Sequence, residues 1–480
     1  MEASLQISSP VKVAPASFRA AAPAMPAVAS SVLMPMAFMI TGLGSLLIAV
    51  AWLILSPTLL ATYHYNQNII ALTHLFVLGW IGSVVMGATY QLVPVALETK
   101  LYSDRLARVQ FAVHCVGFVG MVWMFHVWNL KQVGHFGSVF ATGVGLFAFN
   151  IVQTLRRVPK WSVTATAVSA ALAWICAAAL AGLLIAAAKC LNGSESPSTS
   201  SGLLLHGLRS VAALVSRFDP IGAMHAHAHL GALGCFTMLL VGVSYKVIPM
   251  FTLSEVQSRR RAGASLLLLN LGLAGSFVSI LLRSSAKVAF SLLTVAGLVV
   301  FLIELSAIVR RRKRHTLDWG LKSFLTAVSL VLPLAVLSLV LCWPGLPLTS
   351  LTGQLENLYG FLGFAGFISF AIIGMLYKIL PFLVWFKSYS RQVGRAQVPS
   401  LSDMYSSAGQ AMGYWSYVVG LLVTSVGIVR SSETFTRTGC AFLGLGLLTL
   451  LLNVGSMMRH LLQPRLKPLA ASPSNTSKLA

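Results

Sequence analysis

The stretch at residues 74–94, HLFVLGWIGSVVMGATYQLVP, is the first of three similar segments in this 480-residue chain that align without gaps. The second copy, residues 229–249, reads HLGALGCFTMLLVGVSYKVIP, and the third, residues 361–381, reads FLGFAGFISFAIIGMLYKILP. All three share a glycine, a tyrosine and a proline at fixed spacing: Gly87/Tyr90/Pro94, Gly242/Tyr245/Pro249 and Gly374/Tyr377/Pro381. Each copy is long and apolar enough to cross a hydrocarbon layer about 30 Å thick. The pattern therefore predicts a membrane protein with an internal threefold repeat.

Nine further apolar segments surround these three. Hydrophobic residues make up 57% of the chain and charged residues 9%, against roughly 25% charged in an ordinary soluble domain. We expect twelve transmembrane helices at about 31–56, 69–97, 106–128, 135–154, 161–188, 225–251, 262–283, 286–309, 322–343, 357–386, 410–430 and 436–460. The three copies are then the second, sixth and tenth helices. Because four is even, all repeats cross in the same direction, unlike the inverted repeats of many transporters. The predicted fold is an all-α integral membrane protein with three parallel four-helix repeats, at about 31–154, 161–309 and 322–460.

The net charge of +23 is explained by membrane topology. With both termini on one side, that side carries 24 of the 34 Lys and Arg residues, the opposite side carries eight, and Lys246 and Lys378 lie inside spans. This asymmetry follows the positive-inside rule. We therefore expect a multi-pass protein of the inner (cytoplasmic) membrane with both termini cytoplasmic, in contact with the lipid bilayer and its anionic headgroups. Nucleic acid is not an expected partner.

Three segments fall outside the predicted helices. Residues 1–30 are rich in Ala, Pro and Ser and are expected to form a flexible cytoplasmic tail, as are residues 461–480. An external loop is expected at about 189–224, opening with NGSESPSTSS at 192–201. At the ends of the repeated helices we expect each proline to terminate its helix at the cytoplasmic edge. Lys246 and Lys378, three residues earlier, are expected to snorkel to that surface, with a role in a proton path as the alternative.

The histidines are distributed unlike the other basic residues. Eight of the eleven fall on the predicted outer side: His64, His74, His126, His135, His206, His225, His227 and His229. His74 and His229 lead two of the three copies, and His225 and His229 are four apart on one helix face, whereas His227 points about 160° away. Imidazole within lipid is costly unless it is paired, hydrogen-bonded or bound to a metal. We therefore predict His74 and His229 as cofactor ligands, and His225, His229 and the mid-membrane His114 as candidate metal ligands.

The six cysteines do not extend this site. They are scattered along the chain, and no two have the CxxC spacing or the CxxCH context of covalent haem attachment. Small packing residues are the expected role.

Twelve helices, a threefold pattern, and histidines leading the second and sixth helices resemble subunit I of the haem-copper oxidases, nearest to the cbb-type and nitric-oxide-reductase branch. The NnrS-type membrane haem proteins of the nitric oxide response are a related comparison, whose His-Ala-His-Glu string is partly echoed by His225-Ala-His-Ala. The resemblance implies that His74 occupies the position of an axial ligand of a low-spin haem. It also implies that a residue within 225–229 occupies the position of a copper ligand. Haem is the cofactor so implied, with copper as a second possibility.

The chain departs from this family at two helices. The stretch 261–283, the seventh helix, has no His or Tyr where the family has a copper-binding His pair. The tenth helix, 357–386, has no His, and Phe361 stands at the position that His74 and His229 hold in the other copies. A complete binuclear centre cannot be assembled from these residues.

Three functions remain open at this point. The first is a haem- or metal-binding membrane protein in respiratory electron transfer, sensing or complex assembly, with a redox partner or respiratory subunits as possible partners. The second is a cofactor-free, proton-coupled transporter or channel on the same scaffold. An active terminal oxidase or nitric oxide reductase ranks last.

Overall fold

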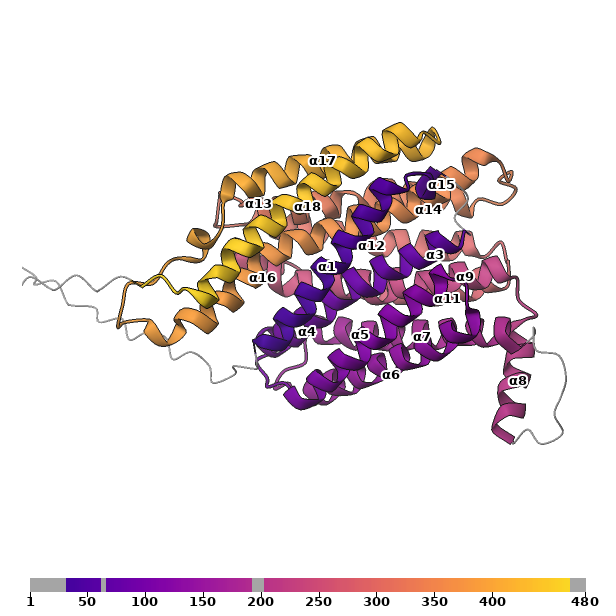
Figure 1. Ribbon diagram of the computed structural model, residues 1–480, viewed down its shortest axis with the longest axis horizontal. Coiled ribbons are helices and arrows are strands. Elements are labelled where there is room, and N and C mark those ends of the chain that lie inside the picture. Colours follow the sequence, from indigo (N-terminus) through magenta and orange to yellow (C-terminus); the bar gives the residue numbers. More distant parts are fainter. Residues whose placement is uncertain (1–31, 62–65, 192–202, 467–480) are drawn as a thin grey trace, which may run out of the picture.

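The computed structural model describes residues 32–61, 66–191 and 203–466. Within these ranges the chain is helical, contains no β-strand, and has twelve helices long and apolar enough to cross a membrane. The predicted all-α membrane fold is confirmed (Figure 1). The predicted tails at 1–30 and from residue 467 onward, the polar stretch 192–202 and His64 lie outside the described residues.

The helices follow one another in three similar sets. The first set is α1 (Leu33–Leu55), the short α2 (Thr58–Ala61), the continuous helix α3–η1–α4 (Gln67–His74, Leu75–Gly82, Ser83–Ala96), α5 (Asp104–His126) and α6 (Leu130–Leu155). The second is α7 (Val163–Leu191), α8 (Leu203–Val215), α9–η2–α10 (Pro220–His229, Leu230–Thr237, Met238–Thr252), α11 (Arg259–Leu281) and α12 (Lys287–Arg310). The third is α13–α14 (Trp319–Ser329, Val331–Cys342), α15–η3–α16 (Ser350–Phe361, Leu362–Ser369, Phe370–Tyr389), α17 (Ser407–Val429) and α18 (Glu433–Leu462), with short 3₁₀ turns η4 (Ser390–Gln392) and η5 (Leu401–Met404) before α17.

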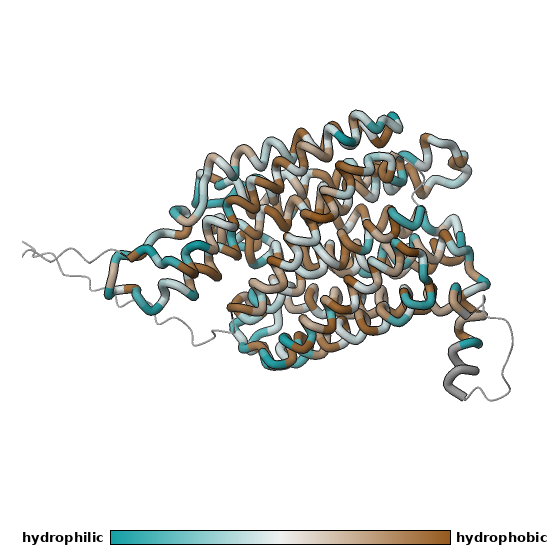
Figure 2. The backbone as a smooth tube through the Cα atoms, viewed as in Figure 1, coloured by the Kyte–Doolittle hydropathy of each residue, from teal (hydrophilic) through white to brown (hydrophobic). Residues whose placement is uncertain are grey.

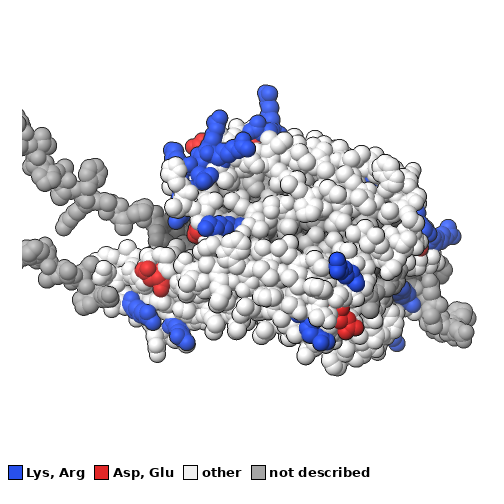
Figure 3. All heavy atoms as spheres, turned by 90° about the horizontal axis from the view of Figure 1, so that it is seen from above, with Lys and Arg blue, Asp and Glu red and all other residues white. Residues whose placement is uncertain are grey.

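The helices lie side by side, with an apolar middle and polar ends (Figure 2). We call the end at which α4, α10 and α16 finish the proline side, because Pro94, Pro249 and Pro381 lie there, and the opposite end the histidine side. The proline side is at the left of Figures 1 to 3. On the face seen in Figure 3, Lys and Arg gather more densely toward this left end than toward the right.

The repeated glycine marks a close approach between the first and second helices of each set. A Cβ added at Gly87 would lie 2.7 Å from Cβ of Phe38 in α1, and one at Gly242 would lie 2.0 Å from Cβ of Ala167 in α7. At Gly374 it would lie 2.4 Å from the carbonyl oxygen of Gly320 in α13. Only glycine permits these contacts, which explains why it recurs at this position.

A second recurring feature links the third and fourth helices of each set. Ser103, Ser258 and Ser406 are the N-cap residues of α5, α11 and α17, where each side chain accepts a hydrogen bond from a first-turn amide. The amide of each serine donates in turn to a buried side chain of the following helix: Asn150 at 3.1 Å, Glu304 at 2.9 Å and Asn453 at 2.9 Å. The same polar junction therefore occurs three times on the proline side.

The third recurring feature is a π-helical segment in each repeated helix. The segments η1, η2 and η3 begin one residue after His74, His229 and Phe361 and each spans eight residues. π-Helical turns are rare and occur frequently at functional sites. The three leading positions of the repeat thus lie immediately before a local change in helix register.

The prediction that proline ends these helices is wrong in detail. α4 continues two residues past Pro94, α10 three past Pro249, and α16 eight past Pro381, to Tyr389. The extension of α16 is held by packing, because the Tyr389 hydroxyl bonds His460 Nδ1 of α18 at 2.7 Å and accepts the Arg465 amide at 2.9 Å. These tertiary contacts offset the hydrogen bond that proline removes from a helix.

The two intramembrane lysines have different environments. Lys246 is exposed, in agreement with the expected snorkelling. Lys378 does not snorkel freely: its ammonium forms an ion pair with Asp318, the N-cap residue of α13, and lies 5.1 Å from the ring centre of Phe251. The Lys378 side chain is 12% exposed and that of Asp318 is 26% exposed. The pair joins the first and second helices of the third set.

The expected external loop at 189–224 is more ordered than predicted. It contains α8 (Leu203–Val215), and α9 begins at Pro220, where Asp219 caps its first turn by accepting the Gly222 amide at 2.7 Å. The sixth transmembrane helix therefore starts five residues before its predicted position, and His225, His227 and His229 all lie within its first three turns.

Candidate histidine site

His74 and His229 have the same local geometry on two different helices. The Nδ1 atom of His74 lies 2.7 Å from the carbonyl oxygen of Ile70, and Nδ1 of His229 lies 2.7 Å from the carbonyl oxygen of His225. In both cases the acceptor is one helical turn earlier in the chain. The two repeat positions thus hold their imidazole rings in the same way.

This hydrogen bond decides the tautomer. A carbonyl oxygen can only accept, so Nδ1 must carry the proton, and in the neutral ring Nε2 is left as the atom with the lone pair. Metal-ligating histidines in proteins use this arrangement, in which a hydrogen bond at one nitrogen orients the ring for coordination by the other. The donor chemistry of His74 and His229 therefore fits a metal that binds imidazole, such as haem iron or copper.

His227 shares this arrangement. Its Nδ1 lies 3.0 Å from the carbonyl oxygen of Ala178 in α7, again an acceptor only. A Cβ added at Gly182, one turn further along α7, would lie 3.0 Å from Cε1 of His227, so the ring occupies the space that this glycine leaves. His227 is thus held against α7.

Aromatic rings line the site on both flanks. The His74 ring lies 4.5 Å from Phe125 of α5, centre to centre, and the His229 ring lies 6.1 Å from Tyr359 of α15 at an interplanar angle of 24°. Tyr359 comes two residues before Phe361, so the third set contributes an aromatic ring at the level where the other two contribute imidazoles. The site is therefore built at the histidine side from all three sets.

The structure does not bring the candidate metal ligands His225, His229 and His114 together. Within the described residues no three His, Cys, Asp or Glu side chains lie close enough together to bind one metal ion. His114 is 1% exposed, lies among Phe38, Phe118 and Phe140, and bonds Ser83 Oγ through Nε2 at 2.8 Å. Ser83 is nine residues beyond His74, about 13 Å along the helix. His114 therefore belongs to the interior of the first set.

Two other histidines toward the histidine side bond polar side chains. His126 Nδ1 lies 2.9 Å from Asn68 Oδ1, and His135 Nδ1 lies 3.2 Å from Gln132 Oε1. Both contacts are exposed. Neither residue joins the group formed by His74, His227 and His229, which we call the histidine site.

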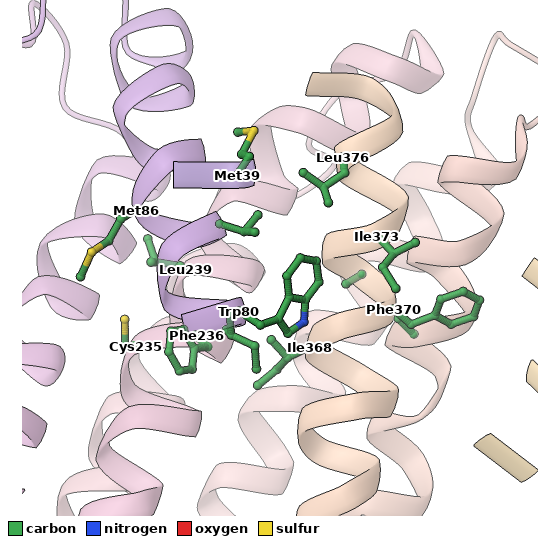
Figure 4. Packing of buried hydrophobic residues seen from close by; sticks show 14 of the residues in the cluster. Met39, Trp80, Met86, Cys235, Phe236, Leu239, Ile368, Phe370, Ile373 and Leu376 are labelled. Carbon is green, nitrogen blue, oxygen red and sulfur yellow. The ribbon is translucent and has the colours of Figure 1, made fainter. Parts of the chain in front are cut away.

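On the side toward the bundle centre, the histidine site adjoins the buried ring of Trp80, which we call its floor. Trp80 in η1 is fully buried, and its indole Nε1 donates across the bundle to Ser369 Oγ of η3 at 2.9 Å. Figure 4 shows Trp80 between the inner helices with Phe236 and Ile368 close by. The π-helical segments thus meet at mid-bundle, one to two turns below the histidines.

Helical periodicity left His227 out of the site. It grouped His225 with His229 and placed His227 on another face, and in the structure that face contacts α7. The available signal was Gly182, whose missing side chain leaves room for the ring. Periodicity within one helix carries no information on this contact.

No protein-family model matches the chain, and the search of curated proteins finds no significant relative.

Proposed function

We propose that the protein is a haem-copper-oxidase-subunit-I-like membrane protein that binds a redox-active metal, haem iron or copper, at its histidine side and takes part in respiratory electron transfer. The observation that carries the proposal is the matched geometry of His74 and His229. Each donates Nδ1–H to a backbone carbonyl one turn earlier at 2.7 Å and so presents Nε2 as a ligand. His227 is oriented by the same kind of bond.

The candidate ligands are His74, His227 and His229, each through Nε2, and within the described residues they do not form a three-residue group around one metal ion. When bound, haem iron or copper would supply one-electron redox chemistry. The backbone carbonyls orient the imidazole rings, and Phe125 and Tyr359 pack beside His74 and His229. Trp80, bonded to Ser369, separates the histidine site from the proline side of the bundle. Sensing and complex assembly remain consistent with the same site.

Oxygen or nitric oxide reduction by this chain is disfavoured by its ligand inventory. The helices α11 and α16 contain no histidine, so the additional copper and haem ligands of a reductase are missing. Because α11 and α16 lack these histidines, we expect a single metal centre instead of the binuclear centre of a reductase.

A proton-coupled path along the bundle axis is also disfavoured. Such a path needs polar groups or water in succession, whereas the centre contains Trp80, Ile81, Phe236 and Ile368, all buried. Of the two lysines that the sequence suggested for such a path, Lys378 is held by Asp318 and Lys246 is exposed. The orientation with the proline side cytoplasmic belongs to this proposal and rests on the positive-inside rule.

The test measures metal and haem on the purified full-length chain. Iron and copper per chain and the optical spectrum are recorded for the wild type, His74→Ala, His227→Ala and the control His135→Ala, whose ring is exposed and outside the site. We expect about one haem or one copper per wild-type and control chain, and loss of most of it in the other two. A Soret band identifies haem, and copper without a Soret band identifies a bare ion. A wild-type chain with neither metal, after expression with both supplied, would remove the proposal.

A further inference from the structure

An apolar cavity of about 120 Å³ lies on the bundle axis in the half toward the proline side. Its wall comes from the three repeated helices, between Val84 and Leu97 in α4, between Phe236 and Ile248 in η2 and α10, and between Ile368 and Ile379 in η3 and α16. The helices α7 and α13 complete it with Thr164, Val168 and Phe324. The cavity is thus separate from the histidine site, with the Trp80–Ser369 contact between them.

The cavity is long and narrow. Val84 and Leu97 are thirteen residues apart, which corresponds to about 20 Å along an α-helix. One leaflet of a bilayer contributes about 15 Å of hydrocarbon, half of the roughly 30 Å core. The lining residues therefore extend over about the depth of one leaflet, and the cavity of about 120 Å³ between them has room for a short segment of a hydrocarbon chain.

The wall offers no free polar group to a ligand. Its hydroxyl groups are those of Thr89, Thr164 and Ser244, and each donates to a backbone carbonyl: Val85, Gly242 and Leu240 respectively. A buried water needs two to four polar partners, which this wall does not provide. A hydrocarbon chain, by contrast, binds favourably to such a wall, because the free energy falls with the apolar area that the two bury against each other.

Two exposed lysines are close in sequence to lining residues toward the proline side. Lys100 follows the lining residue Leu97 by three positions, and Lys246 directly precedes Val247, which also lines the cavity. Lys378 forms an ion pair with Asp318. An apolar cavity in this half of the bundle, with exposed lysines on the helices that line it, matches a hydrocarbon chain that carries an anionic headgroup.

We propose that this axial cavity holds a segment of one hydrocarbon chain of an anionic phospholipid from the leaflet on the proline side, with the headgroup phosphate near Lys100 and Lys246. The lipid fills the space between the three sets and stabilises their association. The proposal does not depend on the histidine site or on any metal.

Native mass spectrometry of the full-length chain tests this proposal. The protein is stripped in a delipidating detergent and mixed with micelles containing dioleoyl phosphatidylglycerol or dioleoyl phosphatidylcholine. The key variant is Ala88→Phe, because Ala88 is a half-buried lining residue and the larger ring fills the slot. The matched control is Ala264→Phe on the exposed face of α11. Should Ala88→Phe fail to fold, Ala96→Leu near the end of the cavity replaces it.

We expect one phosphatidylglycerol per wild-type and control chain, and at least a tenfold lower occupancy in the filled variant. Occupancy is also expected to fall several-fold in Lys100→Gln/Lys246→Gln. No retained lipid on the wild type, or equal retention by the filled and control variants, would overturn the proposal. Equal retention of phosphatidylcholine would overturn the assignment of an anionic headgroup.

Discussion

Replacement of Gly242 by alanine is expected to destabilise the protein, because the new methyl group has no room. The added Cβ would lie 2.0 Å from Cβ of Ala167, whereas carbon atoms in contact are about 3.5–4.0 Å apart. Neither methyl group can rotate away, so α10 and α7 must move apart by about 1.5–2 Å. Overpacking of this kind costs typically about 1–3 kcal/mol, and the better helix propensity of alanine returns at most about 1 kcal/mol.

The assay is thermal unfolding in a fixed detergent, followed by circular dichroism and by labelling of the buried thiols Cys235 and Cys440. Gly231→Ala is the control on the same continuous helix, since an added Cβ there meets nothing within 4 Å. We expect Gly242→Ala to unfold at lower temperature than the wild type and Gly231→Ala to unfold at the same temperature or higher. Ala167→Gly added to Gly242→Ala should restore most of the loss, as a double-mutant cycle for two touching residues requires. If Gly242→Ala is as stable as the control, the close approach of α7 and α10 is wrong.

Two further predictions concern polar contacts at other levels of the bundle. Burial alone would raise the pKa of Asp318, but the hydrogen bond and charge of Lys378 overcome this effect and hold the pKa below its usual value. The pair therefore stabilises the protein above the usual aspartate pKa of about 4, and this stabilisation is lost as the pH falls through the lowered pKa. Thermal unfolding is measured from pH 7 to pH 3. At pH 7 the free energy of unfolding of Lys378→Met should be about 1–3 kcal/mol below that of the wild type, and the two should converge toward pH 3. A difference in stability that does not change with pH would contradict the ion pair. Trp80→Phe removes the donor to Ser369 and should lower the free energy of unfolding by about 1–3 kcal/mol. The double variant Trp80→Phe/Ser369→Ala should lose less than the sum of the two single variants. Additive losses in the same assay would show that the two side chains do not interact.

The fold could be predicted from sequence because its determinants are local. A span of about twenty apolar residues reads as a membrane helix wherever it occurs, and the spacing of glycine, tyrosine and proline is visible without knowledge of contacts. The structure adds the reason for the glycine, which is the approach of Phe38, Ala167 and Gly320.

The π-helical segments could not be predicted. They depend on the hydrogen-bond register of the backbone, and the segments at 75–82, 230–237 and 362–369 share only an apolar, glycine-containing composition that an α-helix tolerates equally well. The partner of Lys378 was missed for a related reason, since Asp318 is sixty residues away in the chain. Both features follow from tertiary packing.

The candidate site was predicted in part. His74 and His229 could be named because they lead two copies of the repeat, and the structure gives them matching hydrogen bonds. His227 was placed outside the ligand set, because helical spacing alone separates it from His229. His114 was included for its depth, but the structure places it among aromatic rings beside Ser83.

X-ray absorption at the edge of the bound metal tests the central claim most directly. The predicted spectrum of the wild-type chain shows imidazole nitrogens as the nearest protein neighbours, at about 2.0–2.1 Å for a typical metal–histidine bond. In His227→Ala the spectrum should show one imidazole fewer, or the metal should be lost. A metal bound mainly by sulfur, or one whose nearest neighbours are the same in His74→Ala, His227→Ala and the wild type, would contradict a centre held by these histidines.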